Sequence, residues 1–148
     1  MRVRRLLSGD ELAVVHAGYL FDRDVPDLAA VRAYLADARN VFLMAFEGSE
    51  ALGFLRATEL LQITTRRKQM FLYEIGVDED LRRHGIGKAL VTTLLRDCRE
   101  RGFSEVFVLT DPSNQAAVGL FRSTGGTTET PADRMYVFPL HSGLEPPV

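Results

Sequence analysis

A loop at residues 78–90 carries the residues whose types and spacing most clearly suggest chemistry. It follows an apolar segment, leads into a helical pattern and contains Gly85 and Gly87. The start of a helix exposes unpaired N–H groups and the positive end of the helix dipole, which favours a phosphate group. The two glycines let the backbone approach a pyrophosphate closely. Positive charge comes from Arg82, Arg83 and Lys88. The loop is therefore predicted to bind phosphate.

Two other phosphate motifs do not match this loop. Leu90 stands where the dinucleotide fingerprint GxGxxG needs its third glycine, and the GK[ST] ending of a P-loop is missing. The alternative interpretation is an ordinary glycine-containing turn that carries surface arginines.

Two acids are candidates for a general base. Glu74 is the only acid inside the apolar segment MFLYEIGV, where an unpaired carboxylate would be costly to bury. Asp111 follows the next predicted strand, at the end where open α/β sheets hold their ligands. The alternatives are that Glu74 is a paired structural acid and that Asp111 caps the turn at Pro112.

Composition narrows the classes of protein. The 18 Lys and Arg against 20 Asp and Glu give a net charge of −2, unlike a general nucleic-acid binder. Cys98 is the only cysteine and the histidines are widely spaced, so neither a disulfide nor a metal site is expected. The sequence contains no apolar stretch long enough to span a bilayer and no convincing signal peptide. A cytoplasmic protein is the default expectation.

The elements that must position these residues follow from hydrophobic periodicity. Strands are expected at 1–7, 41–47, 51–63, 70–77, 103–110, 127–130 and 134–140. Helices are expected after Asp10, over 28–38, over 86–101 and over 114–123. The order β-α-α-β-β-β-α-β-α-β-β predicts an α/β (α+β) fold, a mixed and mostly antiparallel sheet with helices on both faces. One domain is expected over residues 1–140, with a flexible tail at 141–148.

Two spaced motifs resemble those of the GNAT N-acetyltransferases. The family's acetyl-CoA motif, R/Q-x-x-G-x-G/A, is matched in full from Arg82 to Gly87. A second signature, an Asn ahead of a short helix that ends in glycine, is matched by Asn114, Ala117, Leu120, Phe121 and Gly125. The predicted element order is also that of the family. Within it, the sequence looks most like the small, type I aminoglycoside 3-N-acetyltransferases.

This resemblance implies acetyl-CoA as the acetyl donor and assigns residues to its binding. The pantetheine arm would lie along the strand end, where the Val77 N–H would polarise the thioester carbonyl. Asn114 would hydrogen-bond the arm, and Phe121 would pack near its end. The full implied donor set is Ile75, Gly76, Val77, Arg82, Arg83, His84, Gly85, Ile86, Gly87, Lys88, Asn114, Ala117 and Phe121.

Direct attack of an amine on the thioester needs a base and a route for the leaving thiolate. The base is expected to be Glu74 or Asp111. Many family members have a tyrosine as proton donor where this chain has Phe121, which cannot donate. Tyr136, Ser123 or a water then takes that role, or the thiolate leaves unprotonated, since a thiol pKa is about 8.5.

Acids near the expected acceptor site favour a cationic amine such as an aminoglycoside or a polyamine. Those assigned to substrate binding are Asp22, Asp24 and Glu59. The expected partner is a small-molecule amine, with no nucleic acid and no membrane; dimers are common in the family, so a homodimer is allowed. Competing interpretations are a protein lysine or N-terminal acetyltransferase, a non-catalytic acyl-CoA-binding module, and a nucleotide- or nucleic-acid-binding domain based on residues 66–68 and on Arg82 and Arg83.

Overall fold

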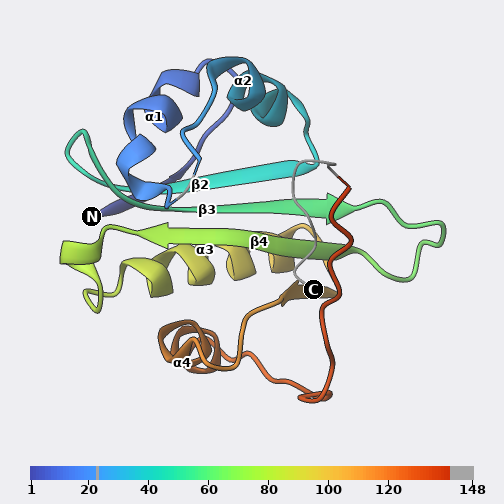
Figure 1. Cartoon of the computed structure of the whole chain (residues 1–148). Coiled ribbons are helices and arrows are strands. Elements are labelled where there is room, and N and C mark those ends of the chain that lie inside the picture. Colours follow the sequence, from blue (N-terminus) through green and yellow to red (C-terminus); the bar gives the residue numbers. More distant parts are fainter. Residues whose placement is uncertain (23, 141–148) are drawn as a thin grey trace.

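A mixed sheet with strand order β1-β2-β3-β4-β5 organises the chain in a computed structural model that describes residues 1–22 and 24–140 (Figure 1). Neighbouring strands are antiparallel except β4 and β5, which are parallel. The strands are β1 (Arg2–Arg5), β2 (Asn40–Glu47), β3 (Glu50–Leu60), β4 (Gln69–Val77) and β5 (Glu105–Val108). The tail expected at 141–148 lies outside the described residues.

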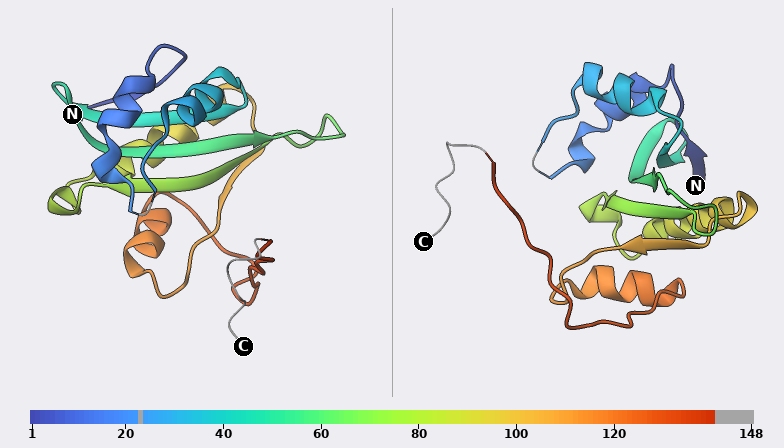
Figure 2. Two further views of the ribbon diagram at one scale, coloured as in Figure 1. Left: turned by 45° about the horizontal axis from the view of Figure 1, so that its top comes forward. Right: turned by 90° about the vertical axis from the view of Figure 1, so that its right-hand side faces the viewer.

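Helices cover both faces of the sheet, as Figures 1 and 2 show. The elements are α1 (Glu11–His16), η1 (Gly18–Leu20), α2 (Leu28–Ala36), η2 (Glu79–Leu81), α3 (Ile86–Glu100) and α4 (Gln115–Ser123). One core packs α1 and α2 against one face, through Val14, Val31 and Phe54. The other packs α3 against the opposite face, with α4 beside it. The predicted fold class is confirmed.

The buried face and the end of helix α3 are as its sequence predicts. Its predicted stripe of Ile86, Leu90, Leu94 and Cys98 is buried, because residues four apart lie on one helix face. The helix ends before Gly102, whose φ is +76°. The N–H of Gly102 donates to the Arg99 carbonyl and that of Phe103 to the Cys98 carbonyl, which is the Schellman pattern that glycine favours.

The prediction of two strands after α4, at 127–130 and 134–140, is wrong. Neither range forms a strand, and β5 remains the edge of the sheet. The side chains of 134–140 that suggested a strand are largely exposed, at 71–89%: Met135, Tyr136, Val137, Phe138 and Leu140. Strand propensity depends on a partner and on burial, and this segment has neither within the described part of the chain. Pro139, inside the second range, also lacks the N–H that pairing requires.

Tyr34 ties α2 to the sheet. Its hydroxyl lies 3.1 Å from the Val41 carbonyl oxygen on β2 and 2.9 Å from the Ala57 carbonyl oxygen on β3. Burial is the main cause that raises the pKa of Tyr34 to about 12. The phenolate is therefore disfavoured in the folded state relative to the unfolded chain, whose tyrosines titrate near pH 10.

We expect Tyr34→Phe to lower the free energy of unfolding at neutral pH by about 1–2 kcal/mol, through the lost hydrogen bonds. Above pH of about 10 the unfolded chain releases the Tyr34 proton first, so wild-type stability falls as the pH rises towards about 12. Tyr34→Phe has no hydroxyl at this position, so its stability should fall less over this pH range. Urea unfolding across this pH range measures both effects. Tyr136→Phe, at a residue that is 80% exposed, is the control; an alkaline slope unchanged in Tyr34→Phe would contradict the assignment.

Candidate active site

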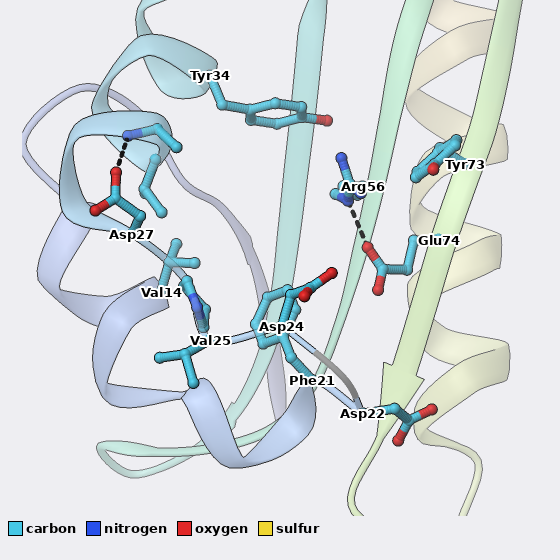
Figure 3. Close-up of a pocket in the computed structure, with 13 residues that line it drawn as sticks. Val14, Phe21, Asp22, Asp24, Val25, Asp27, Tyr34, Arg56, Tyr73 and Glu74 are labelled. Carbon is cyan, nitrogen blue, oxygen red and sulfur yellow. Dashed lines mark hydrogen bonds and ion pairs between the residues drawn. The ribbon is translucent and has the colours of Figure 1, made fainter. Parts of the chain in front are cut away.

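Two pockets meet at the end of β4. The first, here the aromatic-acid pocket, has a volume of about 700 Å³ and lies between the sheet and the segment from α1 to α2 (Figure 3). The second, here the loop pocket, has a volume of about 600 Å³ and lies between β4, the start of α3 and α4. Glu74 and Asp22 line both pockets. A group bound in one pocket and a group bound in the other could therefore both lie beside these carboxylates.

An irregularity in β4 turns Glu74 towards the aromatic-acid pocket. In the pairing of β3 with β4, Arg56 faces Glu74 but the next residue, Ala57, faces Leu72, so Tyr73 is the extra residue of a β-bulge. Regular alternation would put Tyr73 and Glu74 on opposite faces. Because of the bulge both side chains line the same pocket, while Leu72 and Ile75 both pack in the core under α3.

The loop before α3 has the backbone of an anion site. Arg83 and Gly85 have φ values of +68° and +79°, in the left-handed region. The first helical bond runs from the Ala89 N–H to the Gly85 carbonyl, so the N–H groups of residues 86–88 have no partner within the helix. Three basic side chains line the same pocket: Arg82, Arg83 and Lys88. Successive N–H groups, the helix dipole and these cations all favour a phosphate.

Most residues predicted to bind the donor lie together on the loop pocket. Those that line it are Ile75, Gly76, Val77, Arg82, Arg83, Gly85, Ile86, Gly87, Lys88, Asn114 and Ala117. Two predicted residues do not. His84 places its Nδ1 atom 2.9 Å from the Leu81 carbonyl oxygen, within its own loop. Phe121 packs against the core under α3, and its neighbour Leu120 lines the pocket instead.

Asn114 is held at the start of α4 by its own cap. Its Oδ1 atom accepts a hydrogen bond of 3.1 Å from the Ala117 N–H. No residue in the described ranges accepts a hydrogen bond from its amide nitrogen. That nitrogen is therefore available to a ligand in the loop pocket.

Glu74 is paired with Arg56. The Arg56 Nε atom lies 2.5 Å from Glu74 Oε2, and both side chains are about one-third exposed, at 32% and 35%. The guanidinium carbon is 4.3 Å from the centre of the Tyr73 ring. Sequence reasoning left the pairing of Glu74 open and missed Arg56 and Tyr73. Only the register of β3 against β4, across 18 positions of sequence, would have found the Arg56 contact.

The other predicted catalytic residues lie apart from both pockets. The Asp111 carboxylate accepts a hydrogen bond of 2.8 Å from the Ser113 N–H, and this bond lowers the pKa of Asp111. This is the turn-capping role that sequence left as the alternative. Tyr136 is 80% exposed in the segment after α4. Neither residue lines the aromatic-acid pocket or the loop pocket.

The predicted substrate acids divide between two places. Asp22 and Asp24 line the aromatic-acid pocket, and neither accepts a hydrogen bond from any residue that the structure describes. Asp27 also lines it, but its carboxylate caps α2 by accepting from the Ala30 N–H. Glu59 lies outside the pocket, within 3.9 Å of Lys68 Nζ and 3.7 Å of Arg101 Nη2. The acidic wall therefore consists chiefly of Asp22, Asp24 and Glu74.

Two further searches cover the described residues alone. No group of three or more His, Cys, Asp or Glu side chains within 1–22 and 24–140 is placed to hold a metal ion. No helix of these same residues is long and apolar enough to cross a membrane.

Unpaired N–H groups and basic side chains at a helix start, adjoining an acid-lined pocket, would suit a transferase with a phosphate-bearing donor. The model of the acetyltransferase (GNAT) family matches residues 9–125. The chain belongs to this family, whose activity is acetyl-CoA-dependent acetyl transfer. The expected family and enzyme class are thus confirmed.

Curated relatives include human N-acetyltransferase 8, which is 33% identical over 102 residues, 69% of this chain and 44% of the relative. Mouse N-acetyltransferase family 8 member 3 is 31% identical over 122 residues, 79% of this chain and 53% of the relative. The chain spans about half the length of these relatives.

Among solved structures, the aminoglycoside acetyltransferase meta-AAC0020 from an uncultured soil metagenomic sample, in complex with sisomicin, superposes with a TM-score of 0.80. It is 25% identical, over 94% of this chain and 96% of that one. A ribosomal-protein-alanine N-acetyltransferase from Brucella melitensis shares the fold, at 23% identity, 95% and 100% coverage, and a TM-score of 0.72. Neither is named as a type I 3-N-acetyltransferase, so that narrower likeness stays a prediction.

Gly76 is required by packing at the junction of the two pockets. A Cβ atom at this position would lie 2.5 Å from Phe54 Cε1 and 2.9 Å from the Leu20 carbonyl oxygen. We expect Gly76→Ala to lower the free energy of unfolding by about 1–3 kcal/mol, the cost of overpacking. Gly119→Ala, inside α4 with nothing within 4 Å of the new Cβ, is the control and should stabilise slightly. Urea unfolding compares them; equal effects would contradict this role of Gly76.

Proposed function

We propose that the chain transfers an acetyl group from acetyl-CoA to a primary amine of a small cationic acceptor, of the aminoglycoside or polyamine kind. The observation that carries this proposal is the meeting of the two pockets at Glu74. One pocket has the phosphate-binding features, and the other has an acidic wall. The aminoglycoside acetyltransferase neighbours support the acceptor class.

The loop pocket holds acetyl-CoA in this proposal. The N–H groups at the start of α3 bind the pyrophosphate, with Arg82, Arg83 and Lys88 around it. The Asn114 amide nitrogen donates to the pantetheine arm. Bound there, acetyl-CoA supplies the thioester whose carbonyl carbon is attacked.

The end of β4 offers the donor that polarises the thioester carbonyl. The Asp78 N–H donates to the Leu52 carbonyl on β3. Backbone N–H groups alternate in direction along a strand, so the Val77 N–H faces the opposite edge of β4. On that edge the pairing with β5 has ended, at Leu72 with Val108. The free edge supports the assignment of the Val77 N–H as an oxyanion donor.

The acceptor enters through the aromatic-acid pocket. Asp22 and Asp24 attract its ammonium groups, and Glu74 takes the proton of the reacting amine as general base. The amine nitrogen forms a bond to the carbonyl carbon, the carbon–sulfur bond breaks, and coenzyme A leaves as its thiolate. Ser123 lines the loop pocket and Tyr136 does not, but the Ser123 hydroxyl donates to the Leu120 carbonyl oxygen at 2.8 Å. The proton for the thiolate therefore comes from water, or from Ser123 once that bond is released.

We expect Gly85→Glu to weaken acetyl-CoA binding at least tenfold by calorimetry, because it places a carboxylate beside the pyrophosphate and strains a left-handed position. The control is Gly102→Glu, which makes the same change at a φ of +76° beyond the other end of α3. Gly102→Glu should bind acetyl-CoA normally. Equal loss in both variants would remove the support for the loop as the phosphate site.

We expect Glu74→Gln to lower kcat by roughly 10²–10⁴-fold, the usual contribution of a general base. The glutamine carbonyl can still accept from Arg56, so the fold should persist. Asp111→Asn, which can still accept from the Ser113 N–H, should lower kcat less than threefold. Release of the coenzyme A thiol measures both rates. The reverse order of effects would transfer the role of base to Asp111.

A further inference from the structure

Arg56 occupies a central place in the aromatic-acid pocket. It projects from β3, its Nε atom holds Glu74 Oε2, and its guanidinium lies near two aromatic rings (Figure 3). The guanidinium carbon is 4.3 Å from the centre of the Tyr73 ring and 5.9 Å from that of Tyr34. Tyr34 is itself fixed by hydrogen bonds to β2 and β3. An arginine held by an acid and two rings has little freedom to move.

Stability does not explain this arrangement. Both members of the Arg56–Glu74 pair are about one-third exposed, at 32% and 35%, and ion pairs at this exposure contribute little to folding. The pair lies instead in the wall of a pocket beside the proposed base. A role in binding or positioning fits its location better.

Arg56 also has hydrogen-bond donors to spare. Only its Nε atom is engaged; within the described ranges no residue accepts from Nη1 or Nη2. Arg56 is the one basic side chain among the described residues that line this pocket, which Asp22 and Asp24 line as well. The pocket therefore offers anions for an ammonium group and a fixed fork of donors for an oxygen atom.

These features favour one kind of amine. A polyamine carries no oxygen, so it would leave the free Nη donors of Arg56 without an acceptor. An amino sugar or aminocyclitol carries hydroxyl groups next to its amines and satisfies both sides of the pocket. Sites that hydrogen-bond a substrate hydroxyl discriminate strongly against analogues that lack it.

We propose that Arg56 is a specificity-determining and positioning residue: its Nε holds Glu74 in place, and its two Nη groups bind a hydroxyl oxygen beside the reacting amine of an amino-sugar or aminocyclitol acceptor. This inference rests on the acetyl transfer proposed above.

Two ring diamines test the proposal. 2-Deoxystreptamine has hydroxyl groups beside its 1,3-diamine, and cis-1,3-diaminocyclohexane has the same diamine ring without them. We expect the wild-type chain to prefer 2-deoxystreptamine in kcat/KM. In Arg56→Met the ratio of the two kcat/KM values should fall roughly 10- to 100-fold, the effect of one charged hydrogen bond. The test is the change in this ratio between the wild type and Arg56→Met. The wild-type ratio alone is not enough, because hydroxyl groups also alter the basicity of the amine itself.

Two further variants separate this role from a structural one. Arg4→Met removes an arginine that likewise pairs with an acid, Asp10 at 3.0 Å, and lies 5.6 Å from an aromatic ring centre, that of Phe46. Arg4 lines neither pocket, so this variant should keep the wild-type ratio. Arg56→Lys keeps the charge but not the planar fork, so it should not restore the preference. Acetyl-CoA affinity should be unchanged in all variants, since none of these residues lines the loop pocket.

The outcomes are distinct. A ratio that stays at the wild-type value in Arg56→Met, or that Arg56→Lys restores, overturns the proposal. So does acetylation of both rings at equal rates, or of neither ring while spermidine is acetylated; the acetyl transfer itself then stands. Absence of acetyl-CoA binding and of transfer to any of these amines overturns the proposed function as well.

Discussion

The site depends on one structural constraint, the departure of β4 from regular strand pairing. On one side, the parallel pairing with β5 ends at Leu72, which leaves the rest of that β4 edge without a strand partner among the described residues. On the other side, the bulge at Tyr73 turns Glu74 to the face under α1 and α2. The first departure frees backbone donors for an extended ligand. The second places the Glu74 carboxylate beside the position that an acceptor in the aromatic-acid pocket would take. One strand therefore contributes to both pockets.

Gly76 shows how closely this junction is packed. The space that its side chain would fill is taken by Phe54 and by the Leu20 carbonyl. Phe54 in turn stacks on Phe21, with ring centres 4.2 Å apart, and Phe21 lines the aromatic-acid pocket. On the side of Phe21 the wall of that pocket is thus continuous with the core, so its shape there follows from packing.

The sequence predicted the loop pocket well because its determinants are local. A strand end, a glycine loop and a helix start lie within residues 74–90, and the stripe of α3 fixes the face that it buries. The aromatic-acid pocket is different, because Arg56, Tyr34 and Tyr73 meet only through strand register and a bulge, which hydrophobic periodicity does not encode. The two wrong strands after α4 have a related cause. Apolar alternation marks a segment that can pair, and whether it does depends on a partner elsewhere.

The pairing of Glu74 with Arg56 does not conflict with a role as base, because a carboxylate has two oxygens. Arg56 engages Oε2, and no described residue donates to Oε1. The engaged oxygen fixes the direction of the free one, as the second group does when it orients a catalytic base. In the proposed mechanism the same guanidinium would place a positive charge beside the reacting amine, and a like charge disfavours the protonated form of that amine. Asp22 and Asp24 offset this repulsion for the acceptor as a whole. The pocket can therefore attract a cation while favouring the neutral, nucleophilic form of the one nitrogen that reacts.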